Sequence, residues 1–266
     1  DIAMMTHTSN FNEDTVISAG GTNNGTVSKS IKFIGKASHA GGAPHNGINA
    51  LNAANLAMAG IHFQRETFQE KDSIRIHPII TQGGAAVSSV PADVRMETYV
   101  RGSSTQGYLD ASEKVDRALR AGAMAIGAAV EITTIPGYLP MYQNEQLNNL
   151  YEQNSIHLVG DEGVDRSNVG RFGGFSTDMG DMSQLMPIIH PSVLSTSGDG
   201  HGIDYVVEDY HSAVITAAKA MALTVVDLLH GNGQKAKEIV DNFEPLLSKD
   251  AYLKLLRSMY KEEKFQ

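Results

Sequence analysis

Four histidines stand where a side chain could bind a metal ion or transfer a proton. His7 ends an apolar run, His39 and His190 follow predicted strands, and His201 lies between two glycines. A neutral imidazole nitrogen binds divalent metals, and the ring titrates near neutral pH. From position alone, a structural role is the simpler interpretation of His7. The two interpretations are balanced for His201, and neither is favoured for His39.

A glycine-rich stretch, GGFSTDMGD, carries a second group of polar side chains. Ser176, Thr177 and Asp178 lie together on this predicted turn, where their oxygens could bind the polar end of a substrate. An Asx-rich turn without a ligand is the alternative. The remaining histidines lie mostly within helix or strand patterns, which favours structural or surface roles, with His77 as the exception.

Several classes of function have no support in this sequence. It contains no Walker loop, GxGxxG, GxSxG or HExxH, and no Cys that could ligate zinc. A net charge of -9 without a run of Lys or Arg argues against nucleic acid and anionic membranes as partners. No apolar stretch reaches the roughly 18 residues expected of a membrane span. We therefore expect a cytoplasmic protein with a small-molecule or peptide partner.

The elements that must position these side chains form two groups. A Gly, Asn, Thr and Ser cluster predicts a boundary near Asn23, and two prolines predict another at 136–140. Between them the pattern is β-α-β-β-α-β, which is the order of a four-stranded sheet with both helices on one face. The predicted ranges are strand 30–35, helix 47–66, strands 73–81 and 93–101, helix 108–127 and strand 130–135.

The second half of the sequence alternates helices with short apolar runs and predicts an α/β domain. Helices are expected at 144–158 and at 208–230, the latter ending at Gly231. The last residues, after a predicted N-cap at Ser248, have the pattern of an amphipathic terminal helix. We assign residues 1–23 and 138–266 to one α/β domain and residues 24–137 to an inserted domain.

Six segments, taken in order, resemble the motifs of the aminoacylase and glutamate-carboxypeptidase family of metal-dependent amidohydrolases. They are MMTHT, GKASHAGGAPHNGINAL, TQGGAAVSSVPADV, YVRG, GGFSTDMGD and DGHGID. STDMGDMSQLMPIIHP is most similar to the aminobenzoyl-glutamate hydrolase-like branch. The resemblance implies part of a zinc-peptidase-type α/β catalytic domain with an inserted ferredoxin-like domain that acts as lid and dimerisation module.

The resemblance also implies roles for individual residues. His7 and His201 match metal ligands of a centre that holds two divalent ions, with zinc the default and manganese, cobalt or nickel as alternatives. His39 matches the lid histidine that enters the partner's active site and stabilises the tetrahedral intermediate. Arg101 and the turn at residues 176–178 match substrate-binding positions. Ser88 departs from the family, which usually has Asn there.

One part of the family's site has no counterpart in this sequence. The early metal motif, a bridging ligand and the Glu pair with the general base should precede Asp1, and Glu262 and Glu263 lie in the predicted terminal helix. We expect the complete protein to hydrolyse an amide bond in an N-acyl amino acid, an aminobenzoyl-glutamate-like compound or a dipeptide. It should act as a homodimer through the lid. This chain alone should be inactive.

Two alternatives stay open at this stage. The chain could belong to a non-catalytic dimerisation or binding protein that keeps the fold. It could also be completed by a separate chain that supplies the missing half of the site. The sequence does not identify the acyl group or the amine leaving group.

Overall fold

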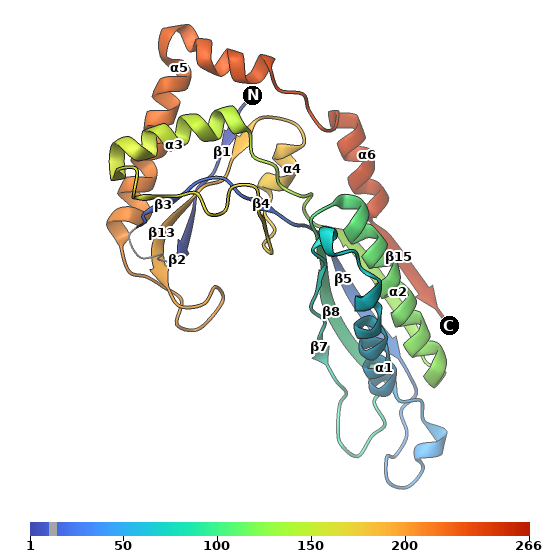
Figure 1. Ribbon diagram of the computed structural model, residues 1–266. Helices are drawn as coiled ribbons and strands as arrows, with labels where there is room; N and C mark the ends of the chain where they lie inside the picture. Colours follow the sequence, from blue (N-terminus) through green and yellow to red (C-terminus); the bar gives the residue numbers. More distant parts are fainter. Residues whose placement is uncertain (11–14) are drawn as a thin grey trace. The chain divides into compact units, whose positions relative to one another are not determined.

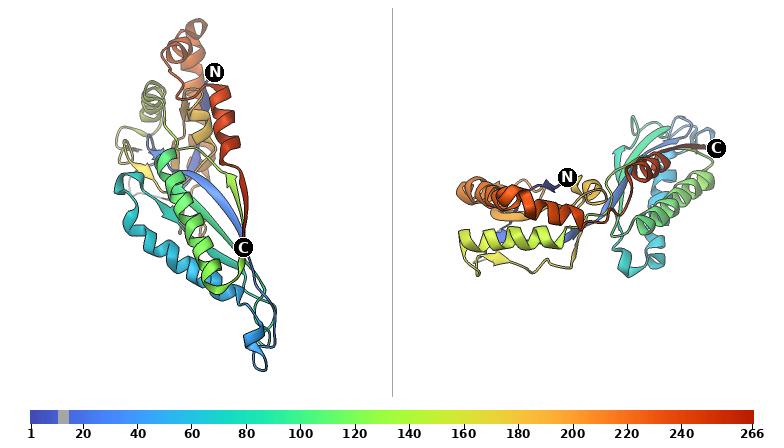
Figure 2. Two further views of the ribbon diagram at one scale, coloured as in Figure 1. Left: turned by 90° about the vertical axis from the view of Figure 1, so that its right-hand side faces the viewer. Right: turned by 90° about the horizontal axis from the view of Figure 1, so that it is seen from above.

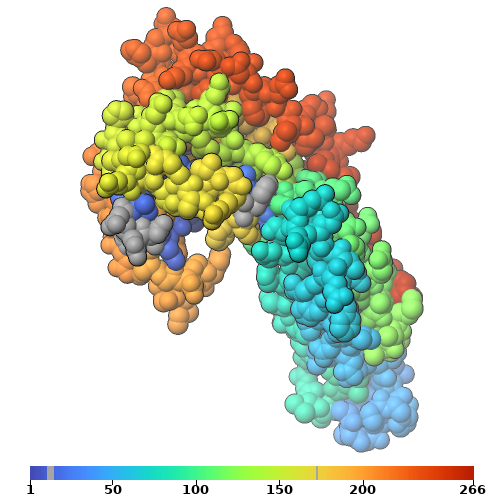
Figure 3. All heavy atoms as spheres, viewed as in Figure 1, coloured from blue at the N-terminus to red at the C-terminus, as the bar shows by residue number. Residues whose placement is uncertain are grey.

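The computed structural model describes residues 1–10 and 15–266, and these form two compact units (Figures 1 and 3). Unit 1 comprises Asp1–Asn23 and Met141–Lys249, and unit 2 comprises Asn24–Pro140 and Asp250–Gln266. Two of the three crossings between the units, at residues 23/24 and 140/141, lie close to the boundaries expected from the sequence. The C-terminal residues differ from expectation, because Asp250–Gln266 belongs to unit 2 and not to the α/β domain.

Unit 2 contains the expected β-α-β-β-α-β order, built on a mostly antiparallel sheet. The sheet order is β15-β9-β5-β8-β6, with β7 also pairing with β8. Pro78 divides the predicted second strand into β6 and β7, because proline has no N–H to donate. The elements are β5 (Gly25–Ile34), α1 (Ala50–Phe63), β6 (Arg75–Ile76), β7 (Ile79–Gln82), β8 (Asp93–Gly102), α2 (Thr105–Ile126), β9 (Ala129–Pro136) and 3-10 turns at Pro44–Asn46, Gln64–Thr67 and Glu70–Asp72.

The C-terminal segment corrects the prediction of one terminal helix. Helix α6 (Lys249–Met259) is present, but Lys261–Phe265 forms strand β15, antiparallel to β9. Glu262 and Glu263 therefore lie in a strand. The charged residues of this segment have the pattern of a solvent-exposed helix. In the observed strand, however, Glu263 forms an ion pair with Arg120 of α2 at 2.7 Å.

The helix-facing side of this sheet buries one charged pair. Lys29 of β5 is fully buried, and its Nζ donates to Asp116 Oδ1 at 2.6 Å and to Thr134 Oγ1 at 2.7 Å. Burial lowers the pKa of Lys29, and the adjacent Asp116 opposes that shift. A buried ion pair contributes little net stability, but removing one partner leaves an uncompensated charge.

Asp116→Ala should therefore destabilise the chain by roughly 3–5 kcal/mol, as measured by urea unfolding. The double variant Lys29→Met/Asp116→Leu should recover most of that loss. The matched control is Asp110→Ala, which removes an exposed carboxylate from the same helix and should cost less than about 1 kcal/mol. Equal losses for Asp116→Ala and Asp110→Ala would contradict the importance of the buried charge.

Unit 1 is an α/β unit with short strands, and its apolar core includes Ile17, Leu147, Tyr151, Ile189 and Val193. Strand β1 (Ala3–Met4) pairs in parallel with β12 (Ile188–Ile189), and β2 (His7–Asn10) in parallel with β13 (Ser192–Ser197). The other elements are β3 (Ile17–Ser18), β4 (Thr22–Asn23), β10 (Val164–Asp165), β11 (Phe172–Gly173), β14 (Val206–Val207), α3 (Glu145–Val159), α4 (Met179–Ser183), a π-helical turn (His211–Thr216) and α5 (Ala217–Asp241).

Helix α5 breaks where the sequence predicts its end. The backbone leaves helical conformation at His230–Gly233 and then continues to Asp241, a continuation that was not predicted. By length and composition alone, His211–Asp241 could cross a membrane, contrary to expectation. In unit 1 it packs on α3 (Figure 2), where Asn154 Nδ2 donates to Asp227 Oδ2 at 2.8 Å. The core helix of a soluble protein meets the same criteria.

Candidate functional site

The parallel strands of unit 1 bring His7 and His190 together. His190 directly follows β12, while His7 begins β2, and their ring centroids lie 6.1 Å apart in an edge-to-face arrangement. Two imidazoles bound to one tetrahedral zinc ion have ring centroids roughly 5 Å apart, given Zn–N bonds of about 2 Å. The observed separation is larger, so the two rings are neighbours but do not have the spacing of two ligands of one zinc ion.

The hydrogen bonding of His7 suits a metal ligand. Its Nδ1 lies 2.6 Å from the carbonyl oxygen of Thr8. A carbonyl oxygen can only accept, so Nδ1 carries the proton and the lone pair is on Nε2. Metal-binding histidines commonly hold their second nitrogen in this way. His7 therefore fits the role that the sequence predicts.

His190 is held by its backbone and not by its ring. Its N–H donates to Gln143 Oε1 at 2.8 Å, and Gln143 Nε2 donates to the carbonyls of Gly20 and Gly21 at 2.7 and 2.9 Å. Burial, with a smaller contribution from His7 and opposed by Asp178, lowers the pKa of His190 to about 4. The imidazole is therefore neutral at pH 7. Its buried Nε2 has no hydrogen-bond partner within the described part of the chain.

Gln143 is a residue that sequence reasoning missed, because no motif distinguishes a glutamine that joins two loops. Gln143→Ala should destabilise the chain by roughly 1–3 kcal/mol, since the partly buried N–H of His190 and two carbonyls lose their partner. Urea unfolding measures the loss. Gln153→Ala, at an exposed position of α3, is the control and should leave the unfolding free energy within about 0.5 kcal/mol. Equal stability of both variants would contradict the bridging role.

Asp178, in the predicted turn at residues 176–178, lies close enough to His190 for its charge to raise the pKa of that histidine. Thr177 Oγ1 and Asp178 Oδ1 are 3.3 Å apart. Ser176 Oγ is buried without a hydrogen-bond partner among the described residues. The turn thus places one carboxylate within electrostatic reach of His190.

His201 lies in an exposed loop between β13 and β14. Its backbone is left-handed, with a φ of 67°, and Gly202 N–H donates to Asp199 O at 2.7 Å. His7 pairs with Ser192 at the start of β13, whereas His201 follows the end of that strand. Over residues 1–10 and 15–266, no three His, Asp or Glu side chains gather into a metal-binding group. The two predicted ligands are therefore not assembled into one complete donor set.

In unit 2, two backbone hydrogen bonds to Nδ1 of His39 leave its Nε2 as the nitrogen that can donate. Its Nδ1 accepts from the N–H groups of Gly41 and Gly42 at 3.2 and 2.9 Å, so the neutral ring carries its proton on Nε2. The side chain is exposed, and the Ser88 carbonyl accepts from Ala40 N–H at 2.8 Å. His39 and Ser88 thus lie on adjacent segments, as a shared role requires.

Arg101 lies at the other end of the same sheet. It pairs with Thr26 near the start of β5, and its guanidinium carbon lies 5.2 Å from the centre of the Tyr99 ring. The loop with Ser88 enters β8 at Asp93, eight positions earlier. At about 3.3 Å per residue this is roughly 26 Å. One small substrate cannot contact Arg101 and His39 of the same protomer.

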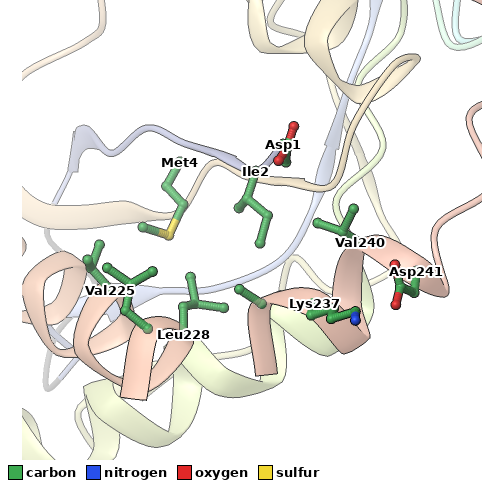
Figure 4. A pocket seen from close by; sticks show the side chains of 10 residues that line it. Asp1, Ile2, Met4, Val225, Leu228, Lys237, Val240 and Asp241 are labelled. Atoms are coloured by element: carbon green, nitrogen blue, oxygen red, sulfur yellow. The ribbon is translucent and has the colours of Figure 1, made fainter. Parts of the chain in front are cut away.

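A separate pocket of about 560 Å³ lies between the first residues and α5 (Figure 4). Ile2, Met4, Val225, Leu228 and Val240 supply most of its apolar lining. None of the predicted site residues lines it. The predicted metal ligands of unit 1 and this pocket are therefore different features.

Comparison with known proteins gives matches to both units. The peptidase dimerisation domain, M20_dimer, matches residues 22–125. The Xaa-Arg dipeptidase of Mus musculus is 32% identical over 205 residues, which cover 75% of this chain and 47% of that protein. The chain therefore spans about half the length of this relative.

Two solved structures have the same fold over most of the chain. The aminobenzoyl-glutamate utilization protein of Klebsiella pneumoniae has a TM-score of 0.64 at 18% identity and covers 88% of this chain and 56% of its own. A dinuclear metal-binding peptidase of the M20 family from Bacillus subtilis has a TM-score of 0.57 at 16% identity, covering 85% and 57%.

Proposed function

Since this chain belongs to the M20 family of peptidases and amidohydrolases, we propose that the protein carrying it is a metal-dependent hydrolase of amide bonds. The observation that carries the proposal is the 32% identity to a dipeptidase over a segment longer than either unit. The preferred substrate is a dipeptide, with N-acyl amino acids and aminobenzoyl-glutamate-like compounds as the other members of the class.

In this proposal His7 and His201 hold metal ions, and the neutral His190 lies beside His7. Bound divalent ions supply Lewis acidity, which activates water and polarises the amide carbonyl. The turn at residues 176–178 binds a polar end of the substrate. Further donors and the general base come from sequence beyond this chain, which by itself is inactive. The support is the fraction of the relative that the chain covers and the incomplete donor set of the described residues.

The site is completed by a second protomer. Arg101 binds substrate in its own protomer. His39 of the partner donates a hydrogen bond from its Nε2–H to the oxyanion that forms as the carbonyl is attacked. Ser88, on the segment beside His39, contacts the same substrate. The separation of His39 from Arg101 along β8 supports this division of roles. The lid is then both a dimerisation module and part of the active site.

The metal roles predict that His7→Ala and His201→Ala each lower kcat/KM of the complete protein by at least roughly 100-fold. Each variant should also bind less zinc, manganese, cobalt or nickel, measured by elemental analysis after dialysis. The substrate panel contains Xaa-Arg dipeptides, N-acyl amino acids and aminobenzoyl-glutamate. This chain alone is assayed in parallel and should hydrolyse none of them.

His157→Ala is the control, because His157 is an exposed histidine of unit 1 whose Nδ1 also bonds to a backbone carbonyl. It should keep wild-type metal content and activity. Unchanged metal content and activity in His7→Ala and His201→Ala would refute their roles. A complete protein that binds no metal and hydrolyses nothing would instead favour a non-catalytic dimerisation protein.

The shared site predicts complementation between two inactive variants. His39→Ala should lower kcat by roughly 10²–10³-fold, as expected when an oxyanion donor is removed, and Arg101→Ala should mainly raise KM. Mixed and reassembled in equal amounts, the two should recover roughly a quarter of wild-type activity, because half the dimers are mixed and each has one intact site. No recovery in mixed dimers of proven composition would place both residues in one protomer's site.

A further inference from the structure

Helices α1 and α2 pack on one face of the unit 2 sheet, and the other face points away from them. Lys29 of β5 marks the helix face, because its ammonium binds a carboxylate of α2, and it pairs with Thr98 of β8. Side chains alternate between the two faces along a strand, so Tyr99 and Arg101 lie on the opposite face. Tyr99 is 52% exposed, whereas Val100, which lies between them, is fully buried.

A second arginine lies directly opposite Arg101 on that face. Arg75 of β6 pairs with Arg101 in the antiparallel ladder. Residues that are directly opposite carry their side chains on one face, with Cβ atoms roughly 4.5–5.5 Å apart. Within residues 1–10 and 15–266, the exposed Arg75 forms no ion pair with a carboxylate, and its Nη1 donates to the carbonyl oxygen of Ile74 at 3.2 Å. Like charges directly opposite each other destabilise a sheet, so this pair indicates a role outside the fold itself.

The ring of Tyr99 orders one of the two guanidinium groups. The guanidinium carbon of Arg101 lies 5.2 Å from the centre of this ring, within the roughly 6 Å over which cation–π attraction acts. Stacking uses the flat face of a guanidinium, whereas a carboxylate binds at its N–H edge. Tyr99 therefore restricts the orientation of Arg101 without occupying the edge that recognises an anion.

We propose that Arg75 joins Arg101 in binding one carboxylate of the substrate, so that the lid selects substrates whose amine-side residue has a free acid. Each guanidinium presents a fork of N–H donors that matches a carboxylate, and an anion bound between the two also offsets their repulsion. Dipeptides, N-acyl amino acids and aminobenzoyl-glutamate all carry such a carboxylate. The inference rests on the proposed function, in which Arg101 binds substrate, and adds Arg75 and the chemical group that is recognised.

Binding to the metal-depleted complete protein, in which no metal-dependent hydrolysis takes place, tests the recognition by itself. The probes are alanyl-arginine and its C-terminal amide, and calorimetry should give a Kd at least roughly tenfold lower for the acid. Arg75→Gln should lose most of this preference, and Arg75→Lys should keep part of it, because lysine retains the charge but not the fork. Arg95→Gln is the control. It removes an exposed arginine from the same face of β8, roughly 20 Å from Arg101, and should keep the preference.

Urea unfolding gives a second readout, which distinguishes a binding residue from a structural one. Because Arg75→Gln removes a like-charge pair, its unfolding midpoint should equal or exceed that of the wild type. A lower midpoint would assign Arg75 to the fold and count against the proposal.

An unchanged acid preference in Arg75→Gln would overturn the proposal, as would a wild-type protein that binds acid and amide equally. An equal loss of preference in Arg95→Gln would also overturn it, because the overall field of the sheet would then explain the binding. A complete protein that prefers the acid but hydrolyses no member of the substrate panel after its metal is restored would count against the proposed function and not against this site.

Discussion

The ten-residue antiparallel pairing of β5 with β8 is the constraint on which the proposed site depends. It runs without a shift from Gly25 opposite Gly102 to Ile34 opposite Asp93. A regular ladder of this length is stiff and separates what it carries at its two ends. One end leads to the loops of His39 and Ser88, and the other carries Arg101. In the proposed function, residues that serve one substrate therefore come from two protomers, and dimerisation is part of the mechanism.

Unit 1 achieves its arrangement by a different means, because its strands are short and its loops hold the functional groups. Parallel pairing of β1 with β12 and of β2 with β13 brings His7 near His190. Gln143 then joins the backbone of His190 to the loop at Gly20 and Gly21. Within residues 1–10 and 15–266, the buried Nε2 of His190 has no hydrogen-bond partner, and His7 bonds to the Thr8 carbonyl through Nδ1. Positioning through backbone contacts therefore keeps the chemistry of both imidazoles available.

The sequence predicts secondary structure well where the local pattern and the packing agree. It predicts it less well where a strand pairs with a partner that is distant in the sequence. Helices α1, α2 and α3 and strands β5, β8 and β9 were recognisable from periodicity and turn residues. Strand β15 was not, because its partner lies more than 120 residues away and its charges match a solvated helix. Motifs singled out His39 and His7 as candidates, and their hydrogen bonds in the structure indicate which ring nitrogen carries the proton. The meeting of His7 with His190 needed two parallel pairings that no local signal specifies.

The proposed shared site places one demand on the assembly. If His39 completes the partner's site, both partners must receive one from the other, and only a two-fold interface makes that exchange reciprocal.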